Sequence, residues 1–350
     1  MTGVGVIGFG RVGRGLIREL WLRGQGDLLR AVAEVNPCGR DAAELTVDLA
    51  YLLAHDPCYG RFPAPVSAEG ANLVIGGRAL PVFYGGRPAT VDWAAAGVGI
   101  LVEASGDPNA AAEASALAGN VADGAVERVL ITRSEAAADV TLVKGVNWET
   151  YDPARHRVVS CSTCTANALA PVLGVIDQAF GVASGAIATI HPALSGDTLL
   201  DAPAPQANAG RSGLTVRPVT SEVARTTAQV LPRLMGRLSA MSLRVPTLLV
   251  NALLADIVLE RPPAAAGEVV ALLEAACAGP LRGVTAMERG FLGRPRVAAD
   301  FLGDTHSALV DINWISLNGA LLRILLWHDN ERAYCARVAD TLALVMGHPA

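Results

Sequence analysis

A cysteine and a histidine in the second half of the chain could form a pair for covalent catalysis. Cys164 lies in the segment Val-Ser-Cys-Ser-Thr-Cys-Thr-Ala-Asn that begins at Val159, and His191 follows 27 residues later at the end of an apolar run. A thiolate is a nucleophile, and a nearby imidazole favours it and moves its proton. Cys164 also precedes a helix-like run, whose dipole favours the thiolate. We therefore interpret Cys164 as nucleophile and His191 as base, against the alternative of a buried, inert cysteine.

A glycine-rich turn near the start of the chain is typical of a dinucleotide site. Gly8, Gly10 and Gly13 have the spacing G-x-G-x-x-G, between an apolar run at residues 3–7 and a helix-like run at 12–23. Such glycines allow a tight turn, close approach of backbone to pyrophosphate, and close packing of helix on strand. The helix N-terminus adds free N–H groups for phosphate. A nicotinamide cofactor together with a reactive cysteine points to oxidation of an aldehyde through a thioester.

Apolar runs predict an α/β chain with two domains. In the first half, further runs of strand length follow the glycine-rich turn, which indicates a doubly wound parallel sheet; they cover residues 28–35, 98–103, 128–132 and 141–146. The second half is richer in strands, at residues 186–191, 243–260, 309–313 and 321–327. Helical patterns are predicted at residues 110–117, 264–277 and 330–346.

Length and composition are those of a globular enzyme. The 350 residues suffice for two domains with a sizeable core, and the net charge of -5 gives no reason to expect nucleic acid as a partner. The six cysteines are scattered, which argues against a disulfide framework. The first residues lack the pattern of a signal peptide, and no apolar run of membrane-spanning length is free of charge or proline. We expect a cytoplasmic enzyme without a membrane partner.

Segments spread over almost the whole chain resemble the glyceraldehyde-3-phosphate dehydrogenase family. They occur in the family's order and comprise residues 8–14, 49–53, 59–62, 102–106, 145–147, the Cys164 segment, His191, and residues 199–203, 243–247, 300–304 and 327–331. Some details resemble the erythrose-4-phosphate dehydrogenase branch, namely residues 191–194, 218–220 and 306–311.

The resemblance implies the fold and the assembly. It implies a Rossmann-type dinucleotide-binding domain with a parallel sheet over residues 1–163, completed by a C-terminal helix at 330–350. It also implies an α+β catalytic domain with a mostly antiparallel sheet over residues 164–329. The expected assembly is a homotetramer that acts on a small, phosphorylated hydroxyaldehyde, with NAD or NADP as cofactor and no metal.

The resemblance also implies roles for individual residues. The cofactor would contact Gly8, Gly10, Arg11, Val12, Gly13, Asn36, Pro37, Arg40, Ser105, Gly106, Thr132, Asn330 and Tyr334. The substrate and inorganic phosphate would contact Thr163, Thr165, Ser221 and Arg244, of which Arg244 would anchor an anion. Cys164 would add to the aldehyde, and His191 would take the hydroxyl proton as hydride leaves. Phosphate or water would then cleave the thioester.

Departures from the family pattern affect the choice of cofactor. The chain has Asn36-Pro37 where the family usually has Asn-Asp, so the carboxylate for the ribose hydroxyls is missing there. We expect Glu34 to point away from the ribose, and Arg40 could pair with a 2′-phosphate. Ala202 stands where NAD-selective members carry leucine. The sequence therefore slightly favours NADP, and NAD bound through Asn36 and the backbone is the alternative.

Other departures affect the substrate site. Leu194 replaces a family threonine and Glu222 replaces a glycine, which weakens the case for glyceraldehyde 3-phosphate with phosphorolysis. The alternatives are a hydrolytic enzyme like erythrose-4-phosphate dehydrogenase and a non-catalytic regulatory paralogue. Cys161 forms a C-x-x-C with Cys164. Without a second such pair zinc is not expected, so Cys161 is either a small buried residue or a resolving thiol for Cys164.

Overall fold

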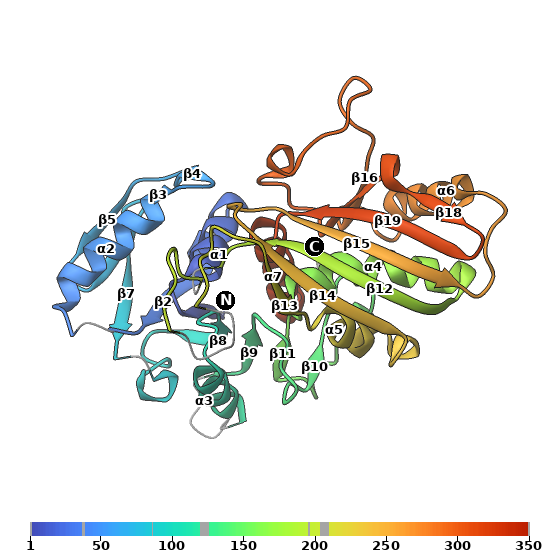
Figure 1. Cartoon of the computed structure of the whole chain (residues 1–350). Helices are drawn as coiled ribbons and strands as arrows, with labels where there is room; N and C mark the ends of the chain where they lie inside the picture. The colour runs from blue at the N-terminus through green and yellow to red at the C-terminus, as the bar shows by residue number, and fades with distance from the viewer. Residues whose placement is uncertain are drawn as a thin grey trace. The chain divides into compact units, whose positions relative to one another are not determined.

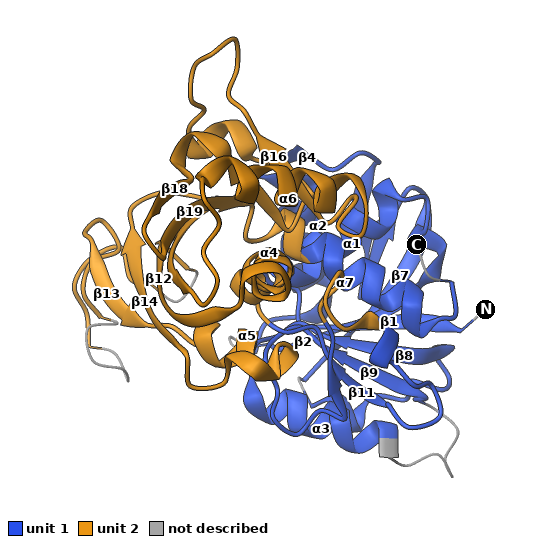
Figure 2. Cartoon of the chain, turned by 90° about the vertical axis from the view of Figure 1, so that its right-hand side faces the viewer, with its two compact units in different colours: residues 1–142, 149–162, 335–350 blue, residues 143–148, 163–334 orange. Residues whose placement is uncertain are grey.

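The chain folds into two compact units, which are coloured separately in Figure 2. The computed structural model describes residues 2–36, 39–85, 87–119, 126–194, 197–203 and 210–348. The first unit comprises Met1–Leu142, Glu149–Ser162 and Cys335–Ala350, and the second comprises Val143–Trp148 and Thr163–Tyr334. These units differ from the predicted domains at residues 143–148, 163 and 330–334, all of which belong to the second unit; Val143, for example, packs with Ala170 and Val230.

The first unit is built on a nine-stranded sheet of order β10-β11-β9-β8-β1-β2-β7-β6-β5 (Figure 1). Its parallel strands are β1 (Gly3–Ile7), β2 (Leu29–Glu34), β7 (Arg78–Tyr84), β8 (Val98–Glu103), β9 (Arg128–Ile131), β10 (Val140–Thr141) and β11 (Val158–Ser160). An antiparallel edge follows with β5 (Val66–Glu69) and β6 (Asn72–Ile75), and β3 (His55–Asp56) pairs with β4 (Gly60–Arg61). The chain passes from β1 to β2 on one side and reaches β8 on the other, so the sheet's switch point lies at β1.

Helices α1 (Arg11–Leu22), α2 (Ala42–Ala54) and α3 (Pro108–Gly119) connect these strands, and residues of α7 (Arg332–Val345) from Cys335 onward belong to the same unit. Every residue of β1 is buried, as expected for a central strand of a parallel sheet. The strand predicted at residues 141–146 is wrong beyond Thr141. The amides of Val146 and Asn147 instead both donate to the Val143 carbonyl, which turns the chain.

The second unit is built on an eight-stranded, mostly antiparallel sheet, as predicted. Its order is β13-β14-β12-β15-β19-β17-β16, with β18 paired to β19. The strands are β12 (Val182–Pro192), β13 (Arg217–Thr220), β14 (Leu238–Val245), β15 (Asn251–Leu259), β16 (Thr285–Glu288), β17 (Ala308–Asp311), β18 (Ser316–Asn318) and β19 (Leu321–His328). Only the pairs β12–β14 and β16–β17 run parallel among the described strands of this sheet. The run predicted at residues 243–260 is thus two strands, β14 and β15. Val250 lies between them and has φ 72°.

Helix α4 (Cys164–Phe180) forms the centre of the second unit's core. It packs with α5 (Val223–Val230) and α6 (Ala266–Ala278) against one face of the sheet. Buried residues of α4 such as Leu169, Val172 and Ile176 meet alternate residues of the strands, including Leu253 and Leu326. The sheet side chains at these alternate positions therefore face α4.

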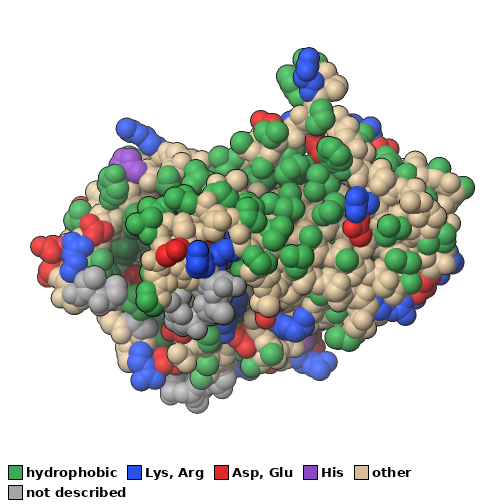
Figure 3. Space-filling view, viewed as in Figure 1, with side chains coloured by type: hydrophobic (Ala, Val, Ile, Leu, Met, Phe, Trp, Pro, Cys, Tyr) green, Lys and Arg blue, Asp and Glu red, His purple; other side chains and the backbone are tan. Residues whose placement is uncertain are grey.

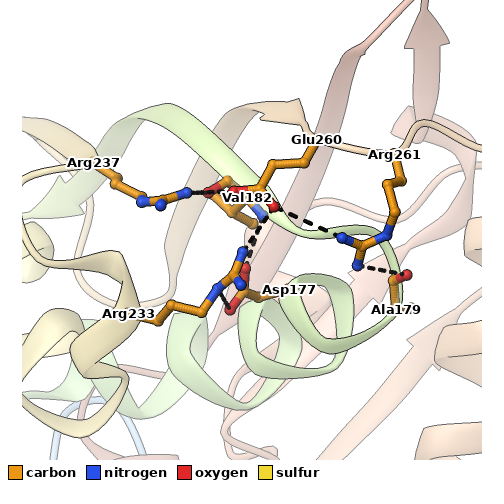
Figure 4. A network of polar contacts seen from close by, with 7 residues as sticks. All are labelled: Asp177, Ala179, Val182, Arg233, Arg237, Glu260 and Arg261. Atoms are coloured by element: carbon orange, nitrogen blue, oxygen red, sulfur yellow. Dashed lines mark hydrogen bonds and ion pairs between the residues drawn. The ribbon is translucent and has the colours of Figure 1, made fainter.

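Ion pairs surround the C-terminal end of α4 (Figure 4). Arg233 contacts both Asp177, at 3.1 Å, and Glu260, at 2.9 Å. Arg237 contacts Glu260 at 2.6 Å and donates to the Val182 carbonyl. The network ties the end of α4 to the start of β12 and the end of β15, and each arginine in it is more than a third exposed.

No helix in the described part of the chain is long and apolar enough to cross a membrane.

Candidate active site

Cys164 is the first residue of α4, at a helix N-terminus in the second unit. Thr163 caps the helix, since its Oγ1 accepts a hydrogen bond from the Ala166 amide at 3.2 Å. Ser162 precedes this cap with φ 59°, a conformation that is uncommon for a residue other than glycine. The turn therefore places Cys164 where helix N–H groups have no intrahelical partner. The Cys164 Sγ lies 3.9 Å from the Thr165 Oγ1.

His191 lies near the end of β12 and pairs in register with Arg244 of β14. The Nδ1 of His191 is 2.8 Å from the Pro192 carbonyl oxygen. A carbonyl can only accept, so this contact places a proton on Nδ1 and leaves Nε2 as the acceptor of the neutral ring. The imidazole is 8% exposed. This is the state that a general base requires.

The positive charge of Arg244 acts on both proposed catalytic groups. Burial, and after it the positive charge of Arg244, lower the pKa of His191 to about 4, while the hydrogen bond with the Pro192 carbonyl and the charge of Asp197 act in the opposite direction. Burial raises the pKa of the Cys164 thiol, while hydrogen bonds with Thr165 and the charge of Arg244 lower it. The imidazole is therefore neutral at pH 7, and Arg244 favours the thiolate next to it.

Arg244 is itself available to an anion. Its guanidinium donates to the Pro192 carbonyl at 3.4 Å, and no carboxylate among the described residues lies within ion-pair distance. Burial lowers the pKa of Arg244, the charges of Asp197 and Cys164 raise it, and the charge of Arg217 lowers it. Arg217 differs, because Asp197 already neutralises it. A half-buried cation that no described carboxylate contacts directly fits the anchor role predicted for Arg244.

The other predicted substrate residues lie around the N-terminus of α4 and the start of α5. The Thr163 Oγ1 is 3.5 Å from the Thr226 Oγ1, which joins α4 to α5. Ser221 precedes α5, and its Oγ accepts from the Val223 amide. Glu222 is exposed and pairs with Arg225 at 2.9 Å. The carboxylate that replaces the family glycine at position 222 is therefore paired with a neighbouring arginine. Leu194 is exposed.

Two polar residues of this unit were not predicted as site residues. Asn251 and His328 pair in register across β15 and β19, and the Asn251 Nδ2 lies 3.0 Å from the His328 Nε2. Both residues are buried. His328 follows an apolar run, as His191 does, whereas Asn251 lies inside the run predicted at residues 243–260 and begins β15 in the structure, so the sequence did not single it out.

The first unit contains the glycine-rich turn, between β1 and α1. Gly8 has φ 89°, and a Cβ there would lie 2.5 Å from the Ser105 Cα. A Cβ at Gly13 would lie 2.1 Å from the Gly8 oxygen. At Gly10, by contrast, a Cβ would meet nothing within 4 Å. Two glycines thus allow close packing within the turn, and the third leaves open space over the N-terminus of α1, which fits a pyrophosphate.

The carboxylate of Glu34, at the end of β2, points toward the glycine-rich turn. One oxygen of Glu34 accepts from the amide of Phe9, within the glycine-rich turn, and the other accepts from the Val35 amide. The prediction that Glu34 points away is therefore wrong, because the last residue of β2 directs its carboxylate to this turn. An acidic residue about 20 positions after the glycine motif is the usual ligand of the ribose 2′-hydroxyl.

Asn36 and Arg40 form a local turn after β2. The Asn36 side chain bonds both the amide and the carbonyl of Arg40. The Arg40 guanidinium contacts Asp48 and lies 3.9 Å from Glu44, both on α2. Arg40 is thus already paired with carboxylates. This pairing argues against the prediction that its guanidinium binds a 2′-phosphate. Pro37 lies outside the described residues.

The remaining predicted cofactor residues of the first unit lie at or near the carboxyl ends of its strands. Arg11 begins α1 and contacts Asp56 at 2.8 Å. Val12 follows it, and its carbonyl accepts from the Cys335 thiol. Ser105 and Gly106 form an exposed turn after β8, and the Ser105 amide donates to Glu103. The Thr132 amide donates to the Glu103 carbonyl, next to that turn.

Asn330 and Tyr334 belong to the second unit. The Asn330 Oδ1 accepts from the Val250 amide at 3.2 Å, which leaves its Nδ2 group as the donor for a ligand. Tyr334 is 5% exposed.

Cys161 has the surroundings of a structural cysteine. Burial raises its pKa to about 12, and Thr341 hydrogen-bonds it. A thiol with so high a pKa contains almost no thiolate at pH 7, whereas disulfide exchange requires a thiolate. The structure therefore favours the small buried residue over the resolving thiol.

The chain is similar to known proteins over nearly its whole length. Residues 2–111 match the NAD binding domain of glyceraldehyde 3-phosphate dehydrogenase, and residues 163–330 match its C-terminal domain. The chain is 35% identical to glyceraldehyde-3-phosphate dehydrogenase of Kitasatospora aureofaciens, over 99% of both chains. It is 34% identical to glyceraldehyde-3-phosphate dehydrogenase 1 of Bacillus cereus, over 98% of both, and 34% identical to the Geobacillus stearothermophilus enzyme, over 98% and 97%.

The chain belongs to the glyceraldehyde-3-phosphate dehydrogenase family. It is therefore an NAD-binding oxidoreductase that acts on an aldehyde, which confirms the family, the fold class and the reaction class predicted from the sequence.

Proposed function

We propose that the protein oxidises a small hydroxyaldehyde carrying an anionic group, such as a phosphate, through a thioester on Cys164. The observation that carries this proposal is the placement of Arg244. It is a half-buried cation without a carboxylate partner among the described residues, and its charge acts on both Cys164 and His191. An anionic substrate group bound there would hold the aldehyde near the thiol.

The chain's own residues support each step of this reaction. The Cys164 thiolate adds to the aldehyde carbon, and amides at the N-terminus of α4 stabilise the resulting oxyanion. His191 has its Nδ1 proton on the Pro192 carbonyl and receives the hydroxyl proton on Nε2 as hydride leaves the carbon. Bound NAD supplies the hydride acceptor. Thr163 and Thr165 flank the sulfur and present hydroxyls to an attacking phosphate or water.

We infer a preference for NAD over NADP, the reverse of the sequence-based expectation. The Glu34 carboxylate at the end of β2 would accept hydrogen bonds from the ribose hydroxyls and repel a 2′-phosphate. Arg40, the residue expected to attract that phosphate, is paired with Asp48.

The acyl acceptor and the substrate can be tested together. A panel of phosphorylated and unphosphorylated aldehydes, with NAD or NADP and with or without phosphate, should give turnover with the phosphorylated aldehydes and NAD. If turnover requires inorganic phosphate, the thioester is cleaved by phosphorolysis. If turnover is equally fast with and without phosphate, the thioester is hydrolysed, as in the erythrose-4-phosphate dehydrogenase alternative. Absence of iodoacetamide-sensitive turnover on every aldehyde would contradict the proposal and favour a non-catalytic paralogue.

We also propose a homotetramer in the cytoplasm, as the family resemblance implies. The face of the second sheet that α4 does not cover carries exposed apolar side chains, among them Met241, Val258 and Leu321 (Figure 3). Such a face is typical of a subunit interface. Light scattering on the eluting protein should give four times the 36.1 kDa mass of one chain. A monomeric mass would contradict the proposed assembly.

A further inference from the structure

Four polar side chains form a row across one end of the second unit's sheet: Arg244, His191, Asn251 and His328. His191 pairs in register with Arg244, and Asn251 pairs with His328. Between these pairs, the register Ile190–Ala252 makes His191 and Asn251 the next opposite positions. Residues opposite one another on neighbouring strands direct their side chains to the same face. We define these four residues as the polar row.

The polar row lies over the apolar core on the face that α4 covers. The residues two positions inward on β15 and β19, Leu253 and Leu326, are fully buried in that core. Asn251 and His328 are themselves 0% and 1% exposed. The proposed thiol belongs to the same surroundings, because the charge of Arg244 acts on Cys164.

Burial of the pair Asn251 and His328 in the polar row lowers the free energy of unfolding. Their one mutual hydrogen bond leaves the His328 Nδ1 and the Asn251 Oδ1 buried without a partner within the described structure. An unsatisfied buried polar atom costs about 1–3 kcal/mol. Apolar side chains like those one row inward would avoid that cost, so the polar pair requires an explanation other than stability.

The backbone beside Asn251 is also held in a costly conformation. Val250 has φ 72°, which a β-branched residue rarely adopts. Its amide donates to the Asn330 Oδ1. The side chain of His328 therefore bonds Asn251, and that of Asn330 bonds Val250. Both contacts hold the start of β15 in place. Such strain persists where the surrounding structure imposes it, and it clusters at functional sites.

The two sides of His191 differ in charge. Burial and the positive charge of Arg244 on one side oppose formation of an imidazolium and lower the pKa of His191, while the charge of Asp197 raises it. On the side of β15, Asn251 is neutral and its Oδ1 has no hydrogen-bond partner within the described structure, and burial keeps His328 neutral. A base that accepts a proton next to an arginine needs neutral, polar neighbours on its other side.

We propose that His328 is a positioning residue for His191: bonded to Asn251, it fixes the neutral, polar side of the imidazole, opposite Arg244. The inference rests on the proposed function, because it concerns the proton that His191 takes from the thiohemiacetal hydroxyl as hydride leaves for NAD. His328 exchanges no proton in this step. It acts through Asn251 on the orientation of the base.

The test compares His328→Phe, which cannot bond Asn251, with His328→Gln, whose amide can. His306→Gln is the matched control, since His306 is a partly exposed histidine of the same unit that pairs with Asp304. We expect His328→Phe to lower kcat by about 10- to 100-fold, the effect of a small misplacement of a catalytic group. KM and the rate of Cys164 alkylation by iodoacetamide should stay near wild type. A deuterated aldehyde should now show a full primary isotope effect on kcat. His328→Gln should recover most of the rate.

Several results would overturn the inference. The inference is wrong if the wild type is active and His328→Phe has the same kcat. It is also wrong if His328→Gln is as slow as His328→Phe. If His328→Phe does not fold, Asn251→Ala replaces it, and an Asn251→Ala variant of normal kcat overturns the inference. A wild type that oxidises no aldehyde would refute the proposed function first, so the two failures are distinguishable.

Discussion

The two ends of α4 hold the same kinds of charged residue in opposite arrangements. At the C-terminal end, Arg233 and Arg237 are exposed and each contacts a carboxylate. At the N-terminal end, Arg244 is half-buried without such a partner among the described residues, and His191 is buried beside it. Exposed pairs satisfy one another and contribute little free energy, whereas an unpaired buried cation remains available to a ligand. The contrast separates structural charges from those that can act on a substrate.

The largest expected effect is at the first residue of α4. Cys164→Ser should lower turnover by at least about 10³-fold, because a covalent nucleophile is lost. Binding of NAD and the melting temperature should remain unchanged. Steady-state kinetics with calorimetry checks this, and a variant retaining a tenth of the activity would refute the thioester mechanism.

Arg244→Gln should have the next largest effect. Loss of a charged contact of roughly 1.5–3 kcal/mol should lower kcat/KM by about 10- to 100-fold for an anionic aldehyde. The acid limb of the pH profile should also move to higher pH, because removal of a neighbouring cation raises the pKa of His191. An unshifted acid limb would show that Arg244 does not act on the base.

Glu34→Ala should change the choice of cofactor. We expect wild type to prefer NAD, and the variant to lose about 10- to 100-fold of that preference, since hydrogen bonds to a charged group contribute roughly 1.5–3 kcal/mol. Arg40→Ala is the control and should leave the ratio unchanged. Kinetics with both cofactors measures it, and a wild-type preference for NADP would contradict the role of Glu34.

Stability should fall on acidification. Histidine titrates near pH 6.5 in an unfolded chain, whereas burial lowers the pKa of His191 to about 4 and that of His328 to about 3. The unfolded chain therefore binds protons first, and stability present above pH 6.5 is lost as the pH falls through these values. Each histidine should contribute a slope of roughly 1.4 kcal/mol per pH unit. Denaturant unfolding of wild type and His328→Gln should show a shallower slope in the variant; equal slopes would contradict a buried, neutral His328.

The smallest effect is expected at the other end of α4. Glu260→Gln removes a carboxylate shared by Arg233 and Arg237, yet it should cost less than about 1 kcal/mol because the pairs are exposed and screened. Turnover should not change. Thermal unfolding and kinetics check both, and a loss of activity above twofold would remove the distinction between the two ends of the helix.

What the sequence could predict depends on whether the signal is local. A few consecutive residues specify the turn at Gly8, Gly10 and Gly13, and the same is true of the start of α4 at Cys164. The motifs and the fold class could therefore be predicted from the sequence. The side-chain direction of Glu34 was not, because it depends on how β1 lies beside β2. The same holds for Arg40, whose partners lie on α2. The polar row depends on the register of four strands, which alternation within one strand does not specify.

The most direct test of the account is to trap the acyl-enzyme. The protein would be mixed with NAD and a phosphorylated hydroxyaldehyde without phosphate, quenched in acid within milliseconds, and digested for mass spectrometry. We expect the peptide containing Cys164 to gain the mass of the acyl group, Cys161 to stay unmodified, and Cys164→Ser to show no adduct. Reduction of NAD at the wild-type rate without any adduct on Cys164, or with the adduct on another residue, would contradict it.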